Sequence, residues 1–315
     1  MIVLVTGASG FLGGRAARRL LADGHEVRAF VRPGSTFELA GAVRVEGDLC
    51  RAEDIARALE GVDAVVHCGA LVKTTGRREE FEAANVEATR HIIAGAGSRP
   101  VVHVSSLSVY DIGKDGETID EEGRYESGAG DRGFYSQTKL AADRLAMESA
   151  AAGAPVTVIR PGVLYGLERR PPLSRQSFAV GKIRVILGNG DYLLPLSHVD
   201  NVTDAIVAAL ETSRARGRAY TIVDPQIPLH DYLAIYRSIA GARWRAFFLP
   251  VWPLLPAVTA AGVLFRGIGR RPPVTSHQLR RATWSARFDT SRARKELGWK
   301  PRVLLAEGLR QSVGA

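Results

Sequence analysis

The chain has 315 residues, which suits one large domain or two closely packed domains, and 46% hydrophobic with 24% charged residues is ordinary for a soluble globular protein. A formal net charge of +9 raises the question of nucleic-acid binding. However, the arginines are spread along the whole chain, and no basic tract with interleaved aromatic residues occurs, so we predict no nucleic-acid partner.

The cysteines and the N-terminus favour a reducing compartment. Cys50 and Cys68 lie in different predicted segments, and neither a disulfide framework nor a metal motif of paired cysteines is visible. The opening MIVLVTGASG leads directly into a strand and a glycine turn instead of a signal peptide. We therefore expect a cytoplasmic protein without a metal site.

Short apolar strands alternate with helices through the first half of the chain. Residues 2–5, IVLV, read as a buried parallel strand. Further strands are expected at 26–31, 41–49, 63–70 and 100–106, and helices at 11–24, 52–61 and 78–97. This alternation predicts an α/β fold built on a doubly wound parallel sheet of the Rossmann type.

The rhythm changes in the second half. Residues 111–133 are rich in Gly, Asp, Glu and Ser and predict a long loop, followed by a helix from 134 to about 152 and a strand at 155–161. After Gly166 the alternation weakens, returns as a helix at 198–211 and a strand at 218–223, and then becomes helical and proline-punctuated. We expect a dinucleotide-binding domain in residues 1–165 plus about 198–224. A smaller, mainly helical substrate-binding domain would comprise about 166–197 plus 225–315.

A glycine-rich turn joins the first strand to the first helix. In TGASGFLGG, Gly7, Gly10 and Gly13 are spaced G-x-x-G-x-x-G. Glycine here permits a tight turn and close approach of the backbone to a pyrophosphate, and the helix N-terminus adds free N–H groups. A purely structural turn is the alternative, but the position directly after a buried strand favours a dinucleotide site.

The end of the second strand indicates which dinucleotide binds. An NAD site usually has a carboxylate there for the ribose 2′-hydroxyl, whereas a 2′-phosphate needs a cation. In FVRPGS, Val31 stands at the expected acid position, Arg32 follows, and Ser35 is a candidate helper. We therefore favour NADP over NAD, with an ordinary surface arginine as the alternative for Arg32. Asp48, at the end of the third strand, is placed to meet the adenine.

The stretch FYSQTK places Tyr135 one helical turn before Lys139. A tyrosine in water has a pKa of about 10 and is a poor acid–base catalyst at neutral pH. A lysine on the same face, together with an oxidised nicotinamide ring, stabilises the phenolate, so Tyr135 is our candidate for proton transfer. The serines of VVHVSSLSVY, where the fifth strand ends, are candidates for holding the substrate oxygen.

At this point the residues resemble a known family. TGASGFLG, GDL, HCGA, NVEAT, SSLSVY, YSQTK, RPGVLYG and HVDNV occur in the order and spacing of the extended short-chain dehydrogenase/reductases. FDTSRARKELGWKP extends the match to nearly the whole chain. The resemblance implies Tyr135 as acid/base and Lys139 as its partner. It implies Ser106, and not Ser105, as the hydroxyl on the substrate oxygen, because the family's serine or threonine lies four residues before the tyrosine matching Tyr110.

The resemblance also implies contacts to the cofactor and a homodimer. The expected cofactor contacts are Gly7, Gly10, Phe11, Leu12, Gly13, Arg32, Asp48, Leu49, Cys68, Gly69, Ala70, Asn85, Ser105, Tyr135, Lys139 and Pro161. Several have structural alternatives: Ser105 as a strand-end cap, Asn85 as a brace for the long helix, and Cys68 as a small packed residue. His67 and His103 lie in predicted buried strands and are expected to be packed core histidines.

Departures from the family pattern narrow the expected chemistry. Dehydratases of the family have Asp-Glu where this chain has Leu107 and Ser108, so we do not expect dehydration. Nucleotide-sugar epimerases have an asparagine where Val163 stands and an arginine where Leu194 stands. Burying a diphosphate against these two aliphatic side chains would leave charges unpaired.

The expected substrate is therefore a small molecule of apolar or weakly charged character. VRAFVRPGS also resembles the dihydroflavonol reductase, 3β-hydroxysteroid dehydrogenase and hopanoid-associated branches of the family. We expect an NADP(H)-dependent oxidoreductase acting on a ketone or secondary alcohol, with a nucleotide-sugar C4 epimerase as the main alternative and a non-catalytic binding protein as a third. The candidate substrate contacts are Val163, Leu164, Tyr165, Leu194 and His198.

One stretch complicates the soluble picture. Residues 246–265, AFFLPVWPLLPAVTAAGVLF, carry no charge and are about long enough to span a bilayer. Pro250, Pro253 and Pro256 interrupt the first half, which argues against a straight spanning helix. We favour packing within the C-terminal region, and peripheral membrane contact is the alternative.

Overall fold

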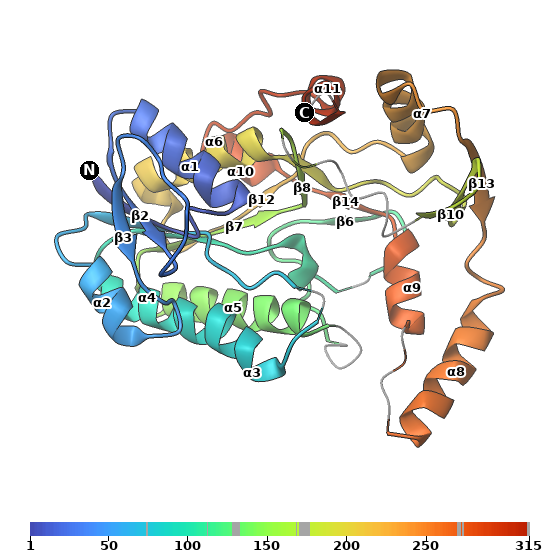
Figure 1. Ribbon diagram of the computed structural model, residues 1–315, viewed down its shortest axis with the longest axis horizontal. Coiled ribbons are helices and arrows are strands. Elements are labelled where there is room, and N and C mark those ends of the chain that lie inside the picture. Colours follow the sequence, from blue (N-terminus) through green and yellow to red (C-terminus); the bar gives the residue numbers. More distant parts are fainter. Residues whose placement is uncertain are drawn as a thin grey trace.

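A computed structural model describes residues 1–73, 75–111, 113–127, 133–167, 169, 177–269, 272 and 274–313. Its centre is a seven-stranded sheet, ordered β12-β7-β5-β4-β1-β2-β3, in which every neighbouring pair is parallel (Figure 1). The strands are β1 (Ile2–Thr6), β2 (Glu26–Val31), β3 (Val43–Glu46), β4 (Ala64–His67), β5 (Val101–Val104), β7 (Val156–Pro161) and β12 (Ala219–Ile222). The predicted doubly wound parallel sheet is confirmed.

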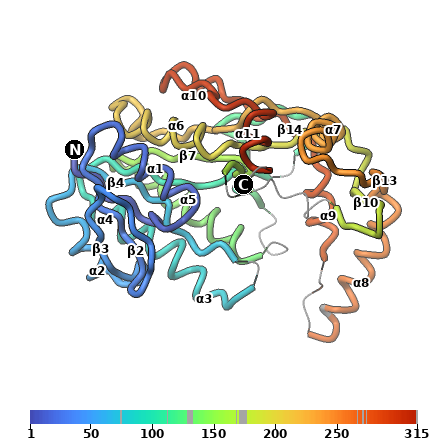
Figure 2. Tube along the Cα trace, turned by 45° about the horizontal axis from the view of Figure 1, so that its top comes forward, coloured from blue at the N-terminus to red at the C-terminus, as the bar shows by residue number. Residues whose placement is uncertain are grey.

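Helices cover both faces of the sheet because its central strands are apolar on both sides. Val3 and Val5 pack toward α1 (Phe11–Ala22) and α6 (Val199–Glu211), while Leu4 between them packs on the opposite face. That second face is covered by α2 (Ala52–Ala58), α4 (Ala88–Ala96) and α5 (Phe134–Ala151). Figure 2 shows the same two helical layers from a second direction.

The strand order reverses beside β1, with β2 on one side and β4 on the other. In an open α/β sheet, the loops leaving the carboxyl ends of strands at such a reversal diverge and form a crevice for ligands. The glycine-rich turn leaves β1 at this point, and the loop with Cys68 leaves β4 beside it.

The segment expected as a long loop contains a short strand, β6 (Glu117–Ile119), which pairs with β14 (Ala286–Phe288) near the C-terminus. A loop prediction could not reveal this pairing, because the two partners are far apart in the sequence. Elsewhere, β8 (Val163–Tyr165) pairs with β11 (Leu196–His198). The short elements α3 (Arg78–Phe81), η1 (Glu82–Glu87), η2 (Leu107–Val109) and η5 (Ser213–Ala215) complete this part.

The C-terminal region contains strands as well as the expected helices. β9 (Ser177–Val180), β10 (Ile183–Leu187) and β13 (Arg245–Leu249) form a separate three-stranded sheet. The helices are α7 (Leu229–Ala240), α8 (Leu255–Gly267), α9 (Ser276–Thr283), α10 (Ser291–Glu296) and α11 (Leu305–Val313). Within the described residues, none of the helices combines the length and the apolar character needed to cross a bilayer.

Candidate active site

The glycine turn after β1 leaves no room for side chains. Gly7 has φ +68, and the Gly10 N–H donates to its carbonyl oxygen at 2.8 Å. A Cβ on Gly13 would lie 2.2 Å from the Gly7 oxygen, and one on Gly7 would lie 2.8 Å from the Gly69 nitrogen. The first turn of α1 has neither a side-chain cap nor an acidic residue. Free N–H groups and bare backbone therefore fit the pyrophosphate of a dinucleotide.

The loop after β4 is tied to β1 through a buried histidine. The Gly69 N–H donates to Thr6 Oγ1 at 3.2 Å, and Thr6 Oγ1 lies 2.7 Å from His67 Nδ1. His67 Nε2 lies 3.1 Å from Thr89 Oγ1, whose hydroxyl donates to the Asn85 carbonyl. These directions place the ring proton on Nε2. Burial, reinforced by the Lys139 charge, lowers the pKa of His67 to about 3, so a neutral imidazole fixes this loop.

Asn85 joins the loop after β4 to α5 from within a π-helix. The segment η1 interrupts the expected long helix, a distortion common at functional sites. Its buried Asn85 accepts from the Leu71 N–H at 2.6 Å and donates to Thr138 Oγ1 at 2.9 Å. Thr138 precedes Lys139 on α5. These bonds brace α5, and contact of Asn85 with a cofactor stays a prediction.

Lys139 lies beneath the carboxyl end of β5. Its side chain is 5% exposed, and Nζ donates to the carbonyl oxygen of Val104, the last residue of that strand, at 2.6 Å. Burial lowers the pKa of Lys139 to about 8, although the Asp143 carboxylate partly opposes the shift. Tyr135 stands one turn earlier on α5 and is partly exposed. The spacing thus puts a desolvated ammonium one turn from a partly exposed phenol.

The serines that follow β5 occupy different environments. Ser105 is buried, donates its N–H to the Ile159 carbonyl at 2.7 Å, and its hydroxyl has no hydrogen bond within the described residues. Ser106 is partly exposed and caps η2, accepting at Oγ from the Ser108 N–H at 3.1 Å. Because η2 packs against α5, the structure brings Ser106 and the Tyr135–Lys139 helix to the same end of β5.

A buried ionic network behind these residues escaped prediction. Arg160, on β7, makes two hydrogen bonds to the Asp143 carboxylate at 2.7 and 3.0 Å, with side chains 2% and 0% exposed. The guanidinium also donates to the hydroxyls of Tyr110 and Tyr125 and lies over both rings. Asp143 is one turn beyond Lys139, so the network locks α5 to β7. The sequence feature that could have revealed this network is the charged Arg160 inside the otherwise apolar strand VTVIRP.

A second missed contact joins the C-terminal region to this end of the sheet. Arg281 on α9 donates to the Tyr110 carbonyl at 3.0 Å and to the Leu107 carbonyl at 3.4 Å. It also pairs with Glu126 at 3.1 Å, and that carboxylate is 1% exposed. The turn carrying Ser106 is therefore held from the C-terminal side as well.

The end of β2 has a free cation and no acid. Val31 is buried at 2% exposure, while Arg32 is exposed and its guanidinium makes no hydrogen bond or ion pair with the described residues. The neighbouring loop is held by Arg44, which donates to the carbonyls of Ser35 and Phe37 at 2.6 Å. An unpaired guanidinium on an ordered loop suits an added phosphate.

The other expected cofactor residues lie at the carboxyl ends of β1, β3, β4 and β7. Asp48 is exposed beyond β3, with Oδ1 accepting from the Cys50 N–H, and Leu49 covers Gly69. Burial raises the pKa of the Cys68 thiol to about 12, which excludes it as a thiolate nucleophile at neutral pH. Phe11 and Leu12 open α1, Ala70 follows Gly69, and Pro161 ends β7.

The five expected substrate contacts divide into two groups. Val163, Leu164 and Leu194 are partly exposed, and Val163 and Leu194 border an apolar cluster of the C-terminal region. Tyr165 and His198 are both 0% exposed, with ring centroids 5.2 Å apart. Both rings are therefore closed to a substrate in this structure.

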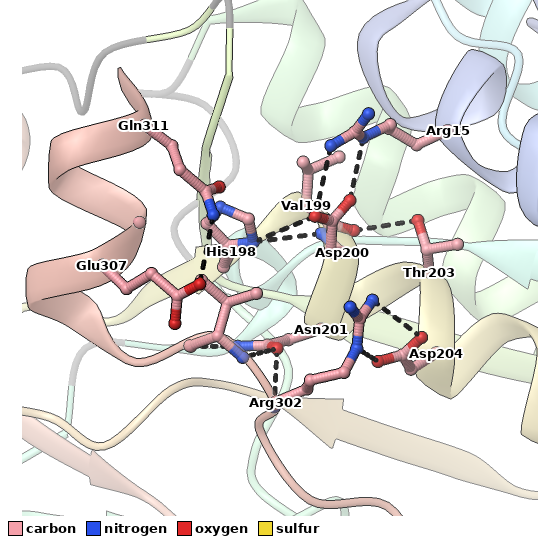
Figure 3. A network of polar contacts seen from close by, with 12 residues as sticks. Arg15, His198, Val199, Asp200, Asn201, Thr203, Asp204, Arg302, Glu307 and Gln311 are labelled. Carbon is pink, nitrogen blue, oxygen red and sulfur yellow. Dashed lines mark hydrogen bonds and ion pairs between the residues drawn. The ribbon is translucent and has the colours of Figure 1, made fainter. Parts of the chain in front are cut away.

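His198 belongs to a structural network instead (Figure 3). The backbone N–H of His198 and the Tyr165 hydroxyl both donate to Asp224 Oδ2, at 2.7 and 3.3 Å. The following Asp200 accepts two hydrogen bonds from Arg15 of α1, at 2.8 and 3.2 Å (Figure 3). The HVDNV motif thus joins the glycine-turn helix to the core.

Asn201 extends this network to the C-terminus. Its Oδ1 accepts from the N–H groups of Arg302 and Val303, both at 2.9 Å, and its Nδ2 donates to Asp224 Oδ1 at 2.7 Å. Sequence reasoning assigned the motif to the family without predicting this role. Among the residues that the structure describes, no group of three side chains could hold a metal ion.

Comparison with known proteins identifies the family. Residues 3–222 match the model of the NAD dependent epimerase/dehydratase family. The chain is 29% identical over 329 residues to human sterol-4-alpha-carboxylate 3-dehydrogenase, decarboxylating, covering 98% of this chain and 86% of that protein.

Two solved structures extend the similarity to three dimensions. The crystal structure of gox2253 superposes with a TM-score of 0.86 at 27% identity, covering 99% of this chain and 97% of that one. MoeE5 in complex with UDP-glucose and NAD gives a TM-score of 0.73 at 25% identity, covering 100% and 98%. The predicted resemblance is confirmed: the chain is an enzyme that belongs to the NAD dependent epimerase/dehydratase family, the extended short-chain dehydrogenase/reductases.

Proposed function

We propose that this enzyme is an NADP(H)-dependent oxidoreductase that interconverts a ketone and a secondary alcohol on an apolar or weakly charged substrate. The observation that carries the proposal is the buried Lys139 ammonium at the carboxyl end of β5, one turn from Tyr135 on the helix that packs against the turn capped by Ser106. The similar human protein is named as a sterol dehydrogenase, which supports hydride transfer on an apolar molecule.

The proposed chemistry divides among three side chains. A nicotinamide held at this site would supply the hydride for a ketone carbon or take it up from an alcohol carbon. Tyr135 moves the accompanying proton to or from the substrate oxygen, and Ser106 holds that oxygen. Lys139 is desolvated, so its charge acts on the phenol with little screening by water and lowers the cost of forming a phenolate.

The cofactor preference rests on the end of β2. With Val31 buried where a carboxylate would stand, the ribose 2′-hydroxyl of NAD lacks its usual acceptor. Arg32 has no competing partner in the described structure and would pair with a 2′-phosphate.

Isothermal titration with NADPH and NADH tests this preference. We expect NADPH to bind more tightly, and Arg32→Ala to reduce that advantage by about tenfold or more, since hydrogen bonds to charged groups contribute about 1.5–3 kcal/mol. Arg216→Ala, also an exposed arginine, is the matched control and should leave both affinities unchanged. Equal affinities for the two cofactors in the unaltered enzyme would contradict the NADP assignment.

A nucleotide-sugar epimerase is the competing proposal, because MoeE5 was solved with UDP-glucose. Val163 and Leu194 oppose it, since neither can pair with a diphosphate. A ketone panel assayed by NADPH oxidation should reveal turnover of apolar ketones. Thermal stabilisation by UDP-sugars, with no turnover of ketones, would favour the epimerase and overturn our proposal.

A further inference from the structure

The small sheet of β9, β10 and β13 has an outward apolar face. In its register, Val185 lies opposite both Phe178 and Phe247, and Ile183 lies opposite Val180. Partners across strands, and residues two apart along a strand, point to the same face. Phe178, Val180, Ile183 and Phe247 are 52%, 57%, 45% and 56% exposed.

The opposite face of this small sheet packs against the core of the C-terminal region. The alternate residues Ile186, Ala246 and Phe248 pack into an apolar cluster with Tyr232 and Leu196. The sheet therefore has a filled core side, and the apolar residues on its outer side are additional to those that the fold needs. A half-buried sheet ordinarily carries polar residues on its solvated face.

The apolar surface continues along the chain into α8. Trp252, in the turn after β13, is 74% exposed, and Val263, Leu264 and Ile268 in and after α8 are 60%, 71% and 69% exposed. Both views place α8 at the same end of the molecule as β10 and β13, away from the seven-stranded sheet (Figures 1 and 2). The concentration of exposed apolar side chains at one end of the molecule indicates an interaction surface and not scattered surface residues.

The charge of this region is one-sided. Arginines occur throughout the chain, but residues 232–288 contain nine of them and no Asp, Glu or Lys. The whole chain has 42 basic and 33 acidic residues, so the basic residues outside this segment equal the acidic ones, and the net +9 resides in the segment. Arg243 and Arg245 are exposed, and Arg245 lies opposite Ile183 on the apolar face.

We propose that the outer face of β9–β10–β13, together with Trp252 and α8, is a docking surface for an anionic lipid membrane. A membrane offers hydrocarbon to the apolar side chains and anionic headgroups to the surrounding arginines. A tryptophan at the edge of such a surface suits the headgroup layer. Lipid docking is independent of the proposed oxidoreductase activity.

Two other occupants fit less well. A second copy docked through the same face would bring one acid-free arginine segment against another, and this like-charge contact opposes a symmetric dimer. Nucleic acid would match the charge but not the aliphatic residues, since single-strand sites use aromatic stacking along a basic groove. A lipid surface satisfies both the charge and the apolar character.

Vesicle co-sedimentation of the full chain tests the proposal. We expect binding to vesicles made of equal parts phosphatidylcholine and phosphatidylglycerol, weaker binding to phosphatidylcholine alone, and release at high salt. Trp252 emission should shift to shorter wavelength on binding, and Trp252→Phe should remove that shift while circular dichroism stays unchanged. Failure to bind the anionic vesicles at low salt overturns the proposal.

Matched variants locate the surface. Phe247→Glu with Leu264→Glu should abolish binding, whereas Leu304→Glu, at a residue 59% exposed outside the surface, should not. Arg243→Gln with Arg245→Gln should weaken binding to anionic vesicles by about tenfold or more, since each juxtamembrane basic residue contributes about 1 kcal/mol. Arg57→Gln with Arg90→Gln makes the same change of charge on α2 and α4 and should have little effect.

Two results would contradict the assigned surface. Equal binding of the surface variants and their controls would place lipid contact elsewhere. Concentration-dependent self-association that Phe247→Glu removes, seen by light scattering without lipid and accompanied by no vesicle binding, would assign the surface to a second copy. Circular dichroism of every variant excludes misfolding as the cause of a loss.

Discussion

Around β5, α5 and β7, charged side chains are buried and paired, whereas residues 232–288 keep nine arginines and no carboxylate. In the first region, Arg160, Asp143 and Lys139 are almost fully excluded from water, and each has defined hydrogen-bond partners. In the second, Arg243 and Arg245 are exposed beside apolar side chains that no described element covers. Buried charge positions the proposed catalytic groups, and exposed charge is available to a partner.

Replacing the buried ammonium should have the largest effect. Lys139→Met removes the charge proposed to stabilise the phenolate but keeps an unbranched side chain under β5. We expect kcat/KM for ketone reduction to fall by about 10²–10⁴-fold, the usual contribution of general acid–base catalysis. Steady-state NADPH oxidation measures it, with circular dichroism confirming the fold. Activity within a few fold of the unaltered enzyme would contradict the role of Lys139.

The next largest effect is on stability. Asp143→Asn leaves the Arg160 guanidinium buried without its counter-charge, which should lower the free energy of unfolding by about 3–5 kcal/mol. The exposed Arg243→Gln in the acid-free segment should change it by no more than about 0.5 kcal/mol. Urea unfolding of both variants makes the comparison directly. Similar decreases in the free energy of unfolding for the two variants would contradict the proposed difference between the buried and the exposed charges.

A pH titration sharpens the same contrast. The folded pKa of Lys139 is about 8, so its ammonium is present below that pH and lost above it. We expect kcat/KM to fall about tenfold per pH unit above pH 8. Vesicle binding, measured over the same pH range as a reference, should stay constant because arginine does not titrate there. A rate that is level to pH 10 would contradict the lowered pKa.

The same shift has an opposite consequence for stability. Between pH 8 and 10.5 the unfolded chain holds a proton that folded Lys139 has released. Because the unfolded state then binds more protons, the contribution of this group to the free energy of unfolding rises with pH across that window. Thermal melts of the unaltered enzyme and Lys139→Met isolate this contribution.

Local sequence patterns predicted the features that depend on neighbouring residues. The glycine turn at Gly7, the alternating strands and the one-turn spacing of Tyr135 and Lys139 can all be read within short windows, and the structure has them in those places. The fold class followed from the same periodicity. Membership of the family followed from the set of motifs in order.

Features that depend on distant residues were missed. The Arg160–Asp143 pair joins a strand to a helix, and β13 pairs with β10 although β11, α6, η5, β12 and α7 lie between them in the chain. Tyr165 and His198 looked like cleft residues from their motifs, yet packing against the C-terminal α11 at Gly308 buries both. The absence of acidic residues from 232–288 can be seen in the sequence. The apolar face of the small sheet in the same region could be identified only from the tertiary structure.

The most direct test of the central proposal is the ketone-dependent oxidation of NADPH by Tyr135→Phe beside Tyr236→Phe, a tyrosine on α7 outside the site. We expect Tyr135→Phe to bind NADPH normally and to lose about 10²–10⁴-fold in kcat, and Tyr236→Phe to retain activity. Turnover by Tyr135→Phe comparable to that of the unaltered enzyme would contradict proton transfer by this phenol.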